Sequence, residues 1–392
     1  ASGYAVTLGD SSNNFGTLAI TGANVTARDT DAIVLGASTV SGTYAVTAGG
    51  AVTQTGALAI TGATTISASG RNVTLDTETN NFQGAVGITG ATVAVVDANA
   101  IVLGASVVSG TYTVTATAGG GITNTGVLAI TNGATFKVDG GQSISLDQAN
   151  TFSSAVTFVP LSGTITAVTI RDSTALELQA LTTTGGLTVT AGGAVTNSGT
   201  LVIPGTTTIS ASGHAVTLGD SSNNFGTTAI TGANVAITDT NAIILGASTV
   251  SGTYSVTADG DITDSGALVI TGVATLVASS GNDVTLDETA NDFQGGLLIT
   301  TGGDVVLRDV GAIVLGAATV SGDYSVIAGG AVTQSGALAI TGATTISASG
   351  HNVTLDTATN NFQGAVGITG ATVAVVDANA IVLGASVVSG TY

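Results

Sequence analysis

Apolar and small polar residues alternate along most of the chain, as in the stretches "YAVTAGGAVTQTG" and "ATVAVVDANAIVLG". These stretches are rich in Val, Ile and Thr, and Gly, Asn and Asp interrupt them, which is the pattern of short β-strands joined by tight turns. No apolar stripe recurs at the 3.6-residue period of a helix. The pattern therefore predicts an all-β protein.

An apolar residue followed by Thr or Ser and then Gly marks a period of about 20 residues, as at Ile20 and Val40. Seventeen such markers are separated by 20 to 22 residues, except that every third interval is 27 to 31 residues long. This spacing is too short for a helical crossover, but it fits a chain in which each complete turn, termed a rung, lies on the one before. We therefore expect a parallel β-helix of about 17 rungs of 20 to 28 residues, with the extra residues of each third rung in a side loop.

A longer repeat of about 70 residues contains three of these rungs. Its marker is a Phe two residues after an Asn, at Phe15, Phe82, Phe152, Phe225, Phe293 and Phe362. Residues 48–112 also match residues 328–392 with only three differences. We expect one continuous solenoid over residues 1–392, a slice of a longer chain, with repeats 1–67, 68–137, 138–210, 211–277, 278–347 and a partial 348–392.

Each repeat also carries a tyrosine or its replacement at one position. If a repeat is three rungs, Tyr44, Tyr112, Tyr254 and Tyr324 form one row along the solenoid, and Leu187 takes the tyrosine position in the third repeat.

Composition narrows the class of protein further. Charged residues are only 7% of the chain, while 57 of its 392 residues are Gly and 44% are hydrophobic, which disfavours a disordered polymer. The chain contains no run of 18 apolar residues, so the sequence predicts no membrane-spanning helix. The net charge of −19 disfavours nucleic acid and anionic lipid as partners, because their phosphates would be repelled.

The stretches "DANAIVLGASVVSGTYTVTATAGGGITNTGVLAITNGATF" and "VTLDTATNNFQGAVGITG" resemble the repeats of giant secreted bacterial surface proteins, the filamentous-haemagglutinin-like and autotransporter-passenger β-helices. The resemblance covers essentially all 392 residues. It implies export to the cell surface, a right-handed solenoid, and a role as an adhesin shaft or extracellular fibre. The third repeat departs most from the pattern, at "FVPLSGTITAVTIRDSTALELQ".

Candidate catalytic residues are sparse and scattered. His214 and His351 occupy a position that holds Tyr4 and Arg71 in other repeats, so we interpret it as solvent-facing. The basic residues Arg28, Lys137, Arg171 and Arg308 fall in different repeats, whereas polysaccharide-cleaving β-helices need clustered acids or a basic residue in one cleft. We therefore expect no catalytic residue and no cofactor.

Aspartates offer two possible sites. Six recur once per repeat, at Asp10, Asp76, Asp147, Asp220, Asp287 and Asp356, and we interpret them as acceptors of main-chain hydrogen bonds at turns. In "ADGDITDSG", Asp259, Asp261 and Asp264 are candidate calcium ligands, although the glycine-rich calcium nonapeptide is absent.

The sequence thus favours a non-catalytic structural protein of the cell surface, with copies of itself as partners and possible contacts to host-cell, matrix or glycan surfaces. A polysaccharide-binding or polysaccharide-cleaving β-helix remains the alternative.

Overall fold

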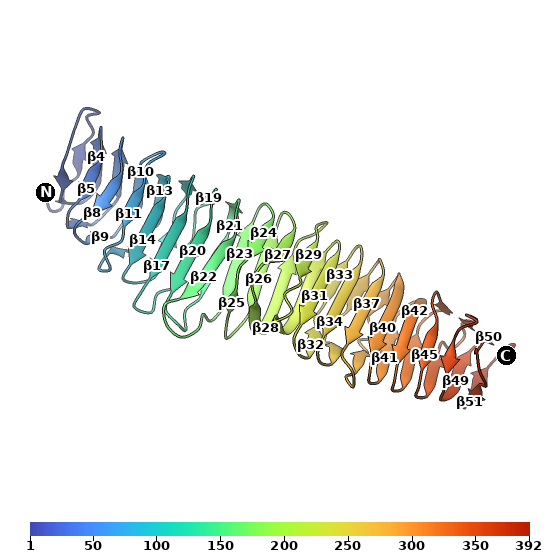
Figure 1. Cartoon of the computed structure of the whole chain (residues 1–392). Helices are drawn as coiled ribbons and strands as arrows, with labels where there is room; N and C mark the ends of the chain where they lie inside the picture. Colours follow the sequence, from blue (N-terminus) through green and yellow to red (C-terminus); the bar gives the residue numbers. More distant parts are fainter. The chain divides into compact units, whose positions relative to one another are not determined.

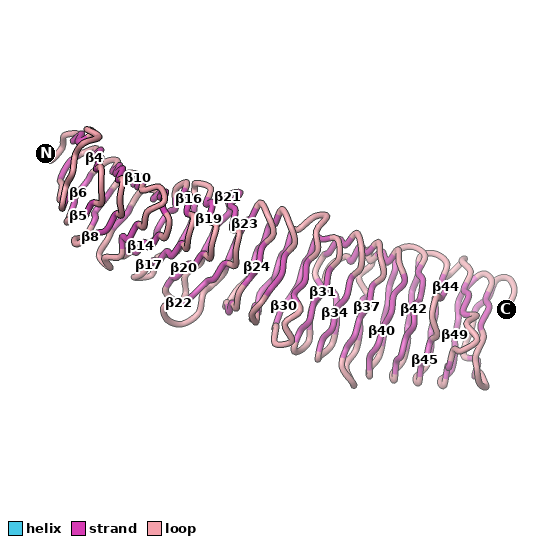
Figure 2. The backbone as a smooth tube through the Cα atoms, turned by 45° about the horizontal axis from the view of Figure 1, so that its top comes forward, coloured by secondary structure: helices cyan, strands magenta, loops and turns pink.

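The computed structural model describes all 392 residues, Ala1 to Tyr392, and contains strands, turns and loops but no helix (Figure 2). Its strand pairs are parallel, and neighbouring strands of a sheet belong to successive rungs. The chain is therefore a parallel β-solenoid, with about 19 rungs, which confirms the predicted fold class. None of its segments forms a helix long and apolar enough to cross a membrane.

The chain forms two compact units, the N-terminal unit Ala1–Gly193 and the C-terminal unit Ala194–Tyr392. Within each unit the rungs follow one another in chain order (Figure 1). A typical rung has one long strand of four to six residues and then two short strands, which are sometimes joined into one. The expectation of a single continuous solenoid stays a prediction.

Both classes of strand are present in the N-terminal unit. The long strands are β4 (Val25–Asp29), β7 (Tyr44–Ala48), β10 (Thr64–Ser67), β13 (Val86–Gly90), β14 (Val93–Asp97), β17 (Tyr112–Ala116), β20 (Ala134–Val138), β22 (Val156–Pro160), β23 (Val168–Asp172) and β26 (Leu187–Ala191). The others are β1 (Val6–Leu8), β2 (Thr17–Leu18), β3 (Thr21–Gly22), β5 (Ile33–Leu35), β6 (Ser38–Val40), β8 (Val52–Gln54), β9 (Leu58–Ile60), β11 (Val73–Leu75), β12 (Asn81–Phe82), β15 (Ile101–Leu103), β16 (Ser106–Val108), β18 (Ile122–Asn124), β19 (Leu128–Ile130), β21 (Ile144–Phe152), β24 (Leu176–Leu178) and β25 (Leu181–Thr182).

The C-terminal unit has the same two classes, except that β28 and β30 each join a short strand to the long strand that follows it. Its long strands are β31 (Val235–Asp239), β34 (Tyr254–Ala258), β37 (Ala274–Ala278), β40 (Gly296–Thr301), β41 (Val305–Asp309), β43 (Tyr324–Ala328), β46 (Thr344–Ser347) and β49 (Ala365–Gly370). The others are β27 (Val195–Asn197), β28 (Leu201–Ser210), β29 (Val216–Leu218), β30 (Asn224–Gly232), β32 (Ile243–Leu245), β33 (Ser248–Val250), β35 (Ile262–Asp264), β36 (Leu268–Ile270), β38 (Val284–Leu286), β39 (Asp292–Phe293), β42 (Ile313–Val320), β44 (Val332–Gln334), β45 (Leu338–Ile340), β47 (Val353–Leu355), β48 (Asn361–Phe362), β50 (Val373–Val375), β51 (Val382–Leu383) and β52 (Val387–Val388).

Long strands stay on one sheet for four rungs and then move to another sheet. In the N-terminal unit β4, β7, β10 and β13 pair in succession, and β14, β17, β20 and β22 pair in succession on the second sheet. The move occurs where β14 follows β13 after only two residues, so that the chain advances by half a rung. In the C-terminal unit the strands β31, β34, β37, β40 and then β41, β43, β46, β49 repeat this arrangement.

One repeat therefore spans three and a half rungs. Three pairings lead from Tyr44 through Thr64 and Val86 to Leu103, and Tyr112 lies half a rung farther along the chain. The predicted three rungs with a side loop are wrong, because the extra residues of each long interval form half a rung of solenoid. The same half rungs explain why there are about 19 rungs rather than 17.

The predicted single row of tyrosines is wrong for the same reason. Tyr44 pairs with Val25 on the first sheet of the N-terminal unit, whereas Tyr112 pairs with Val93 on the second. In the C-terminal unit Tyr254 and Tyr324 likewise lie on different sheets. Leu187 does take the tyrosine position, in the sheet of Tyr44.

The core follows from the two-residue period of the strands. In β4, Val25, Ala27 and Asp29 are buried while Thr26 and Arg28 are exposed. Ile60 and Ile340, the apolar markers of their rungs, are buried as expected. Large and small residues stack on each other, because Tyr44 lies beside Thr64 and Tyr112 beside Ala134. This alternation of large and small side chains suits a narrow, close-packed interior.

Candidate functional site

The two histidines lie at the surface, as their replacement by Tyr and Arg in other repeats predicts. Both His214 and His351 are exposed and each follows a glycine with positive φ, Gly213 or Gly350, in a tight turn. Tyr4, in the same position, is 74% exposed. The position therefore tolerates any side chain that solvent can surround.

Within the N-terminal unit the recurrent aspartates do not share one row, because the first two copies follow strands on different sheets. Asp10 follows β1 on the first sheet of the N-terminal unit, and Asp76 follows β11 on the second. Asp10 accepts hydrogen bonds from the amide and the hydroxyl of Ser12, which hold its pKa below the ordinary value. Asp220 accepts the Ser222 amide in the same way. These two contacts are of the kind expected, namely hydrogen bonds at turns.

Two of the three calcium candidates hold main-chain amides with their carboxylates, whereas Asp259 contributes its main-chain carbonyl, which accepts the Ser279 hydroxyl. Asp261 accepts the amide of Asp283, and Asp264 accepts the amide of Asp287 and the side chain of Asn291. No group of three or more acidic or histidine side chains lies close enough to hold a metal ion. The metal assignment rests on sequence alone.

An asparagine that is buried in every repeat but the first is the most extensively bonded polar side chain. Asn80 is 0% exposed, and its Oδ1 accepts hydrogen bonds from Leu58 N (2.9 Å) and Gln54 Nε2 (2.8 Å). Its Nδ2 donates to Gln54 Oε1 (2.9 Å), to Leu75 O and to Val96 O. Because these partners belong to three successive rungs, Asn80 ties the rungs together at the place where β11 and β12 separate.

The same asparagine is buried in the later repeats, whereas Asn13 in the first repeat is half-buried. It is 0% exposed at Asn80, Asn150, Asn223, Asn291 and Asn360. These residues are the asparagines of the Asn-x-Phe marker, so the sequence revealed their spacing but not their role. A polar residue between apolar strands is normally predicted to lie in a solvent-exposed turn. Only the structure shows that this asparagine is buried between rungs.

An aspartate three residues before the "Ala-Ile-Val-Leu" type of segment completes this polar layer. Asp97 is 0% exposed, and it accepts the Phe82 amide (2.9 Å) and the Asn99 amide (2.8 Å). Burial raises its pKa, and these two hydrogen bonds oppose the rise. Sequence reasoning missed this role. Equivalent buried aspartates are Asp29, Asp172, Asp239 and Asp309.

Four core tyrosines have hydroxyls without a hydrogen-bond partner. They are Tyr44, Tyr112, Tyr254 and Tyr324. Burial raises the pKa of Tyr44 to about 12, and the nearby Ser38 hydroxyl opposes the rise without meeting hydrogen-bond geometry. A phenol held neutral in this way cannot act as a base at physiological pH.

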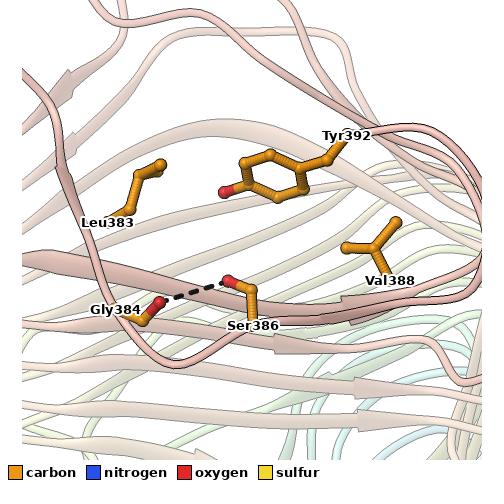
Figure 3. Close-up of a pocket in the computed structure, with 5 residues that line it drawn as sticks. All are labelled: Leu383, Gly384, Ser386, Val388 and Tyr392. Atoms are coloured by element: carbon orange, nitrogen blue, oxygen red, sulfur yellow. Dashed lines mark hydrogen bonds between the residues drawn. The ribbon is translucent and has the colours of Figure 1, made fainter.

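A hollow lined by side chains lies at the last rung. Leu383, Ser386, Val388 and Tyr392 line it, and Ser386 donates a hydrogen bond to the Gly384 carbonyl (Figure 3). In the near-identical segment 48–112, the equivalents Leu103, Val108 and Tyr112 are buried beneath the rung that follows. The hollow is therefore the space that a further rung fills elsewhere in the chain.

A family model described as repeats of unknown function (DUF5649) matches the chain five times, at residues 22–89, 90–159, 166–231, 232–300 and 302–369. Each match spans one set of long strands on one sheet, so the family repeat is the three-and-a-half-rung segment. No curated protein matches the chain. No solved structure matches it either.

Proposed function

The chain belongs to the family described as repeats of unknown function (DUF5649), and we propose that it is a non-catalytic structural solenoid, the shaft of an extracellular bacterial surface fibre or giant adhesin. The observation that carries the proposal is the repetition of identical contacts. The 2.8 Å hydrogen bond from Gln54 to Asn80 recurs at 2.8 Å from Gln334 to Asn360. A shaft requires only that its rungs stack, whereas catalysis requires one unique cluster of reactive side chains.

Surface chemistry supports the same function. Outward positions of the long strands are mostly Thr, Ser and Ala, as at Thr113 and Thr115 in β17. The net charge of −19 repels nucleic acids and anionic membranes. The resemblance to filamentous-haemagglutinin-like repeats supports export to the cell surface.

Copies of the chain are the partners we propose first. Apolar side chains that face outward within the chain, such as Val107 and Val310, which are 57% and 58% exposed, are candidates for such contacts. Host-cell, matrix or glycan surfaces are the further partners of the assembled fibre.

Antibody labelling of intact producer cells, viewed by electron microscopy, tests this function. We expect label along surface fibres and loss of label after protease treatment of whole cells. Label confined to the cell interior contradicts the proposal. Release of sugars from a panel of polysaccharides by the purified chain supports the polysaccharide-cleaving alternative instead.

A further inference from the structure

Three asparagines begin the tripeptide Asn-Val-Thr. They are Asn24, Asn72 and Asn352. Asn-x-Thr is the acceptor sequence for N-linked glycosylation, and it requires a surface position in an exported protein. Neither the solenoid core nor the polar layer around Asn80 accounts for these three residues.

Strand geometry presents the Asn and the Thr of each tripeptide on the outside. Asn24 is exposed, Val25 is buried in the core and Thr26 is exposed again, because side chains alternate with a period of two. Asn72 and Asn352 are also exposed and also precede a buried valine, and the Thr that follows is half-buried. The amide and the hydroxyl of the acceptor sequence therefore share one face.

The hydrogen bonds of these asparagines leave the acceptor nitrogen free. The Oδ1 atom of Asn24 accepts the amide of Thr43 at 2.9 Å, and Asn72 and Asn352 accept the amides of the next rung at 3.3 Å. The Nδ2 atom donates no hydrogen bond in any of the three. The side chain is therefore held through its oxygen while its nitrogen remains available.

The chain contains a matched site without the acceptor sequence. Asn234 is exposed, precedes the buried Val235, and accepts the Thr253 amide at 3.0 Å, as Asn24 does with Thr43. Its tripeptide ends in Ala236 rather than Thr. The sites of Asn24 and Asn234 thus differ at the third residue of the tripeptide, where glycosylation requires Ser or Thr.

We infer that Asn24, Asn72 and Asn352 are acceptor sites for N-linked glycans, an inference that rests on the proposed extracellular location. A bond forms between Nδ2 and C1 of a sugar as the bond from C1 to the diphosphate of a lipid-linked or nucleotide-linked donor breaks. The diphosphate leaves with the electron pair, and the proton released by the amide passes to a base of the transferase. The glycans lie outside the core and leave the stacking of rungs unchanged.

Peptide mass spectrometry of the chain isolated from its producer tests the inference. We expect sugar mass on the peptides of Asn24, Asn72 and Asn352 and none on that of Asn234. Thr26→Ala abolishes modification of Asn24 while keeping the asparagine, and Ala236→Thr creates modification at Asn234.

The proposed location and this inference fail in distinguishable ways. Unmodified asparagines in a chain that antibodies detect on the cell surface overturn the acceptor sites and leave the shaft intact. If the chain is found inside the cell, it is instead expressed as a secreted protein in a eukaryotic host that carries out N-glycosylation. We expect the same asparagines to be modified there. Unmodified Asn24, Asn72 and Asn352 in that host overturn the inference.

Discussion

Tyr44 and Tyr112 hold the same position in consecutive repeats, yet they lie on different sheets of the N-terminal unit. Each sits beside a valine of the preceding rung, and each is followed by a smaller residue, Thr64 or Ala134. The local environment is thus conserved while the sheet changes. It follows that a half-integral number of rungs per repeat presents equivalent outer surfaces on alternate sides within the unit.

Replacing Ile60 by Asp tests the inward register of β9. The change places an unpaired carboxylate in the core, at a cost of several kcal/mol in the free energy of unfolding. Ala59→Asp is the matched control, because Ala59 is exposed in the same strand, and we expect it to change stability by less than about 0.5 kcal/mol. Thermal unfolding followed by circular dichroism measures both, and equal melting temperatures for the two variants contradict the register.

Asn80→Ala tests the polar layer. The substitution leaves the Leu58 amide and the Gln54 side chain without their buried partner, so we expect a loss of about 3 kcal/mol or more. Asn81, next in sequence, makes no side-chain hydrogen bond, and Asn81→Ala serves as the control. Asn360→Ala should cost as much as Asn80→Ala, since its contacts are the same. A negligible loss in both would show that the layer is dispensable.

Tyr324→Phe tests the cost of a buried hydroxyl with no partner. Burial raises the pKa of both Tyr254 and Tyr324. The nearby Ser248 hydroxyl opposes this rise at Tyr254, whereas Ala318 stands at the corresponding position near Tyr324. Removing the Tyr324 hydroxyl should raise stability by about 1 kcal/mol, and Tyr254→Phe should raise it less. Denaturant unfolding midpoints provide the comparison. Destabilisation by Tyr324→Phe would reveal a hydrogen bond that the structure lacks.

Stability should increase as the pH falls from neutrality. Burial raises the pKa of Asp97, Asp172, Asp239 and Asp309 above the unfolded value of 3.8. The folded chain therefore binds protons more readily, and the free energy of unfolding rises as pH falls through the raised pKa values, levelling off below 3.8. Asp10 acts in the opposite sense but is fully exposed.

Melting temperatures between pH 7 and pH 4 measure this dependence. Asp97→Asn should flatten the curve, because the asparagine cannot titrate, and Asp76→Asn is the exposed control that should not. A melting temperature that falls steadily with pH over this range is the contrary result.

The sequence was sufficient for the fold class because strand alternation and a 20-residue period admit few other arrangements. It was also sufficient for the surface position of His214, since a position that accepts His, Tyr and Arg must face solvent. The sequence did not reveal that each repeat contains an extra half rung. A marker such as Ile88 has the local sequence of Ile60, and only pairing shows that Ile88 stacks on Ile66 while Ile60 stacks beneath Phe82.

The polar layer could not be predicted for a different physical reason. Asn80 and Asp97 are polar residues in a segment rich in turn formers, and such residues are usually solvated. Their burial depends on main-chain amides of neighbouring rungs, which no local pattern specifies. The spacing of the Asn-x-Phe marker was visible, but the enclosing contacts are tertiary.

Deleting residues 68–137 tests most directly the central claim that the repeats are interchangeable structural modules. The deletion joins Ser67 to Val138, which are adjacent positions of equivalent long strands. We expect a soluble solenoid with an unchanged melting temperature and a contour length, by electron microscopy, shorter by about 17 Å for three and a half rungs. Deletion of 68–127, the length of three 20-residue rungs, breaks the phase and should destabilise the chain. An unfolded product from the 68–137 deletion, or its loss of a specific activity that the full chain possesses, would contradict the account.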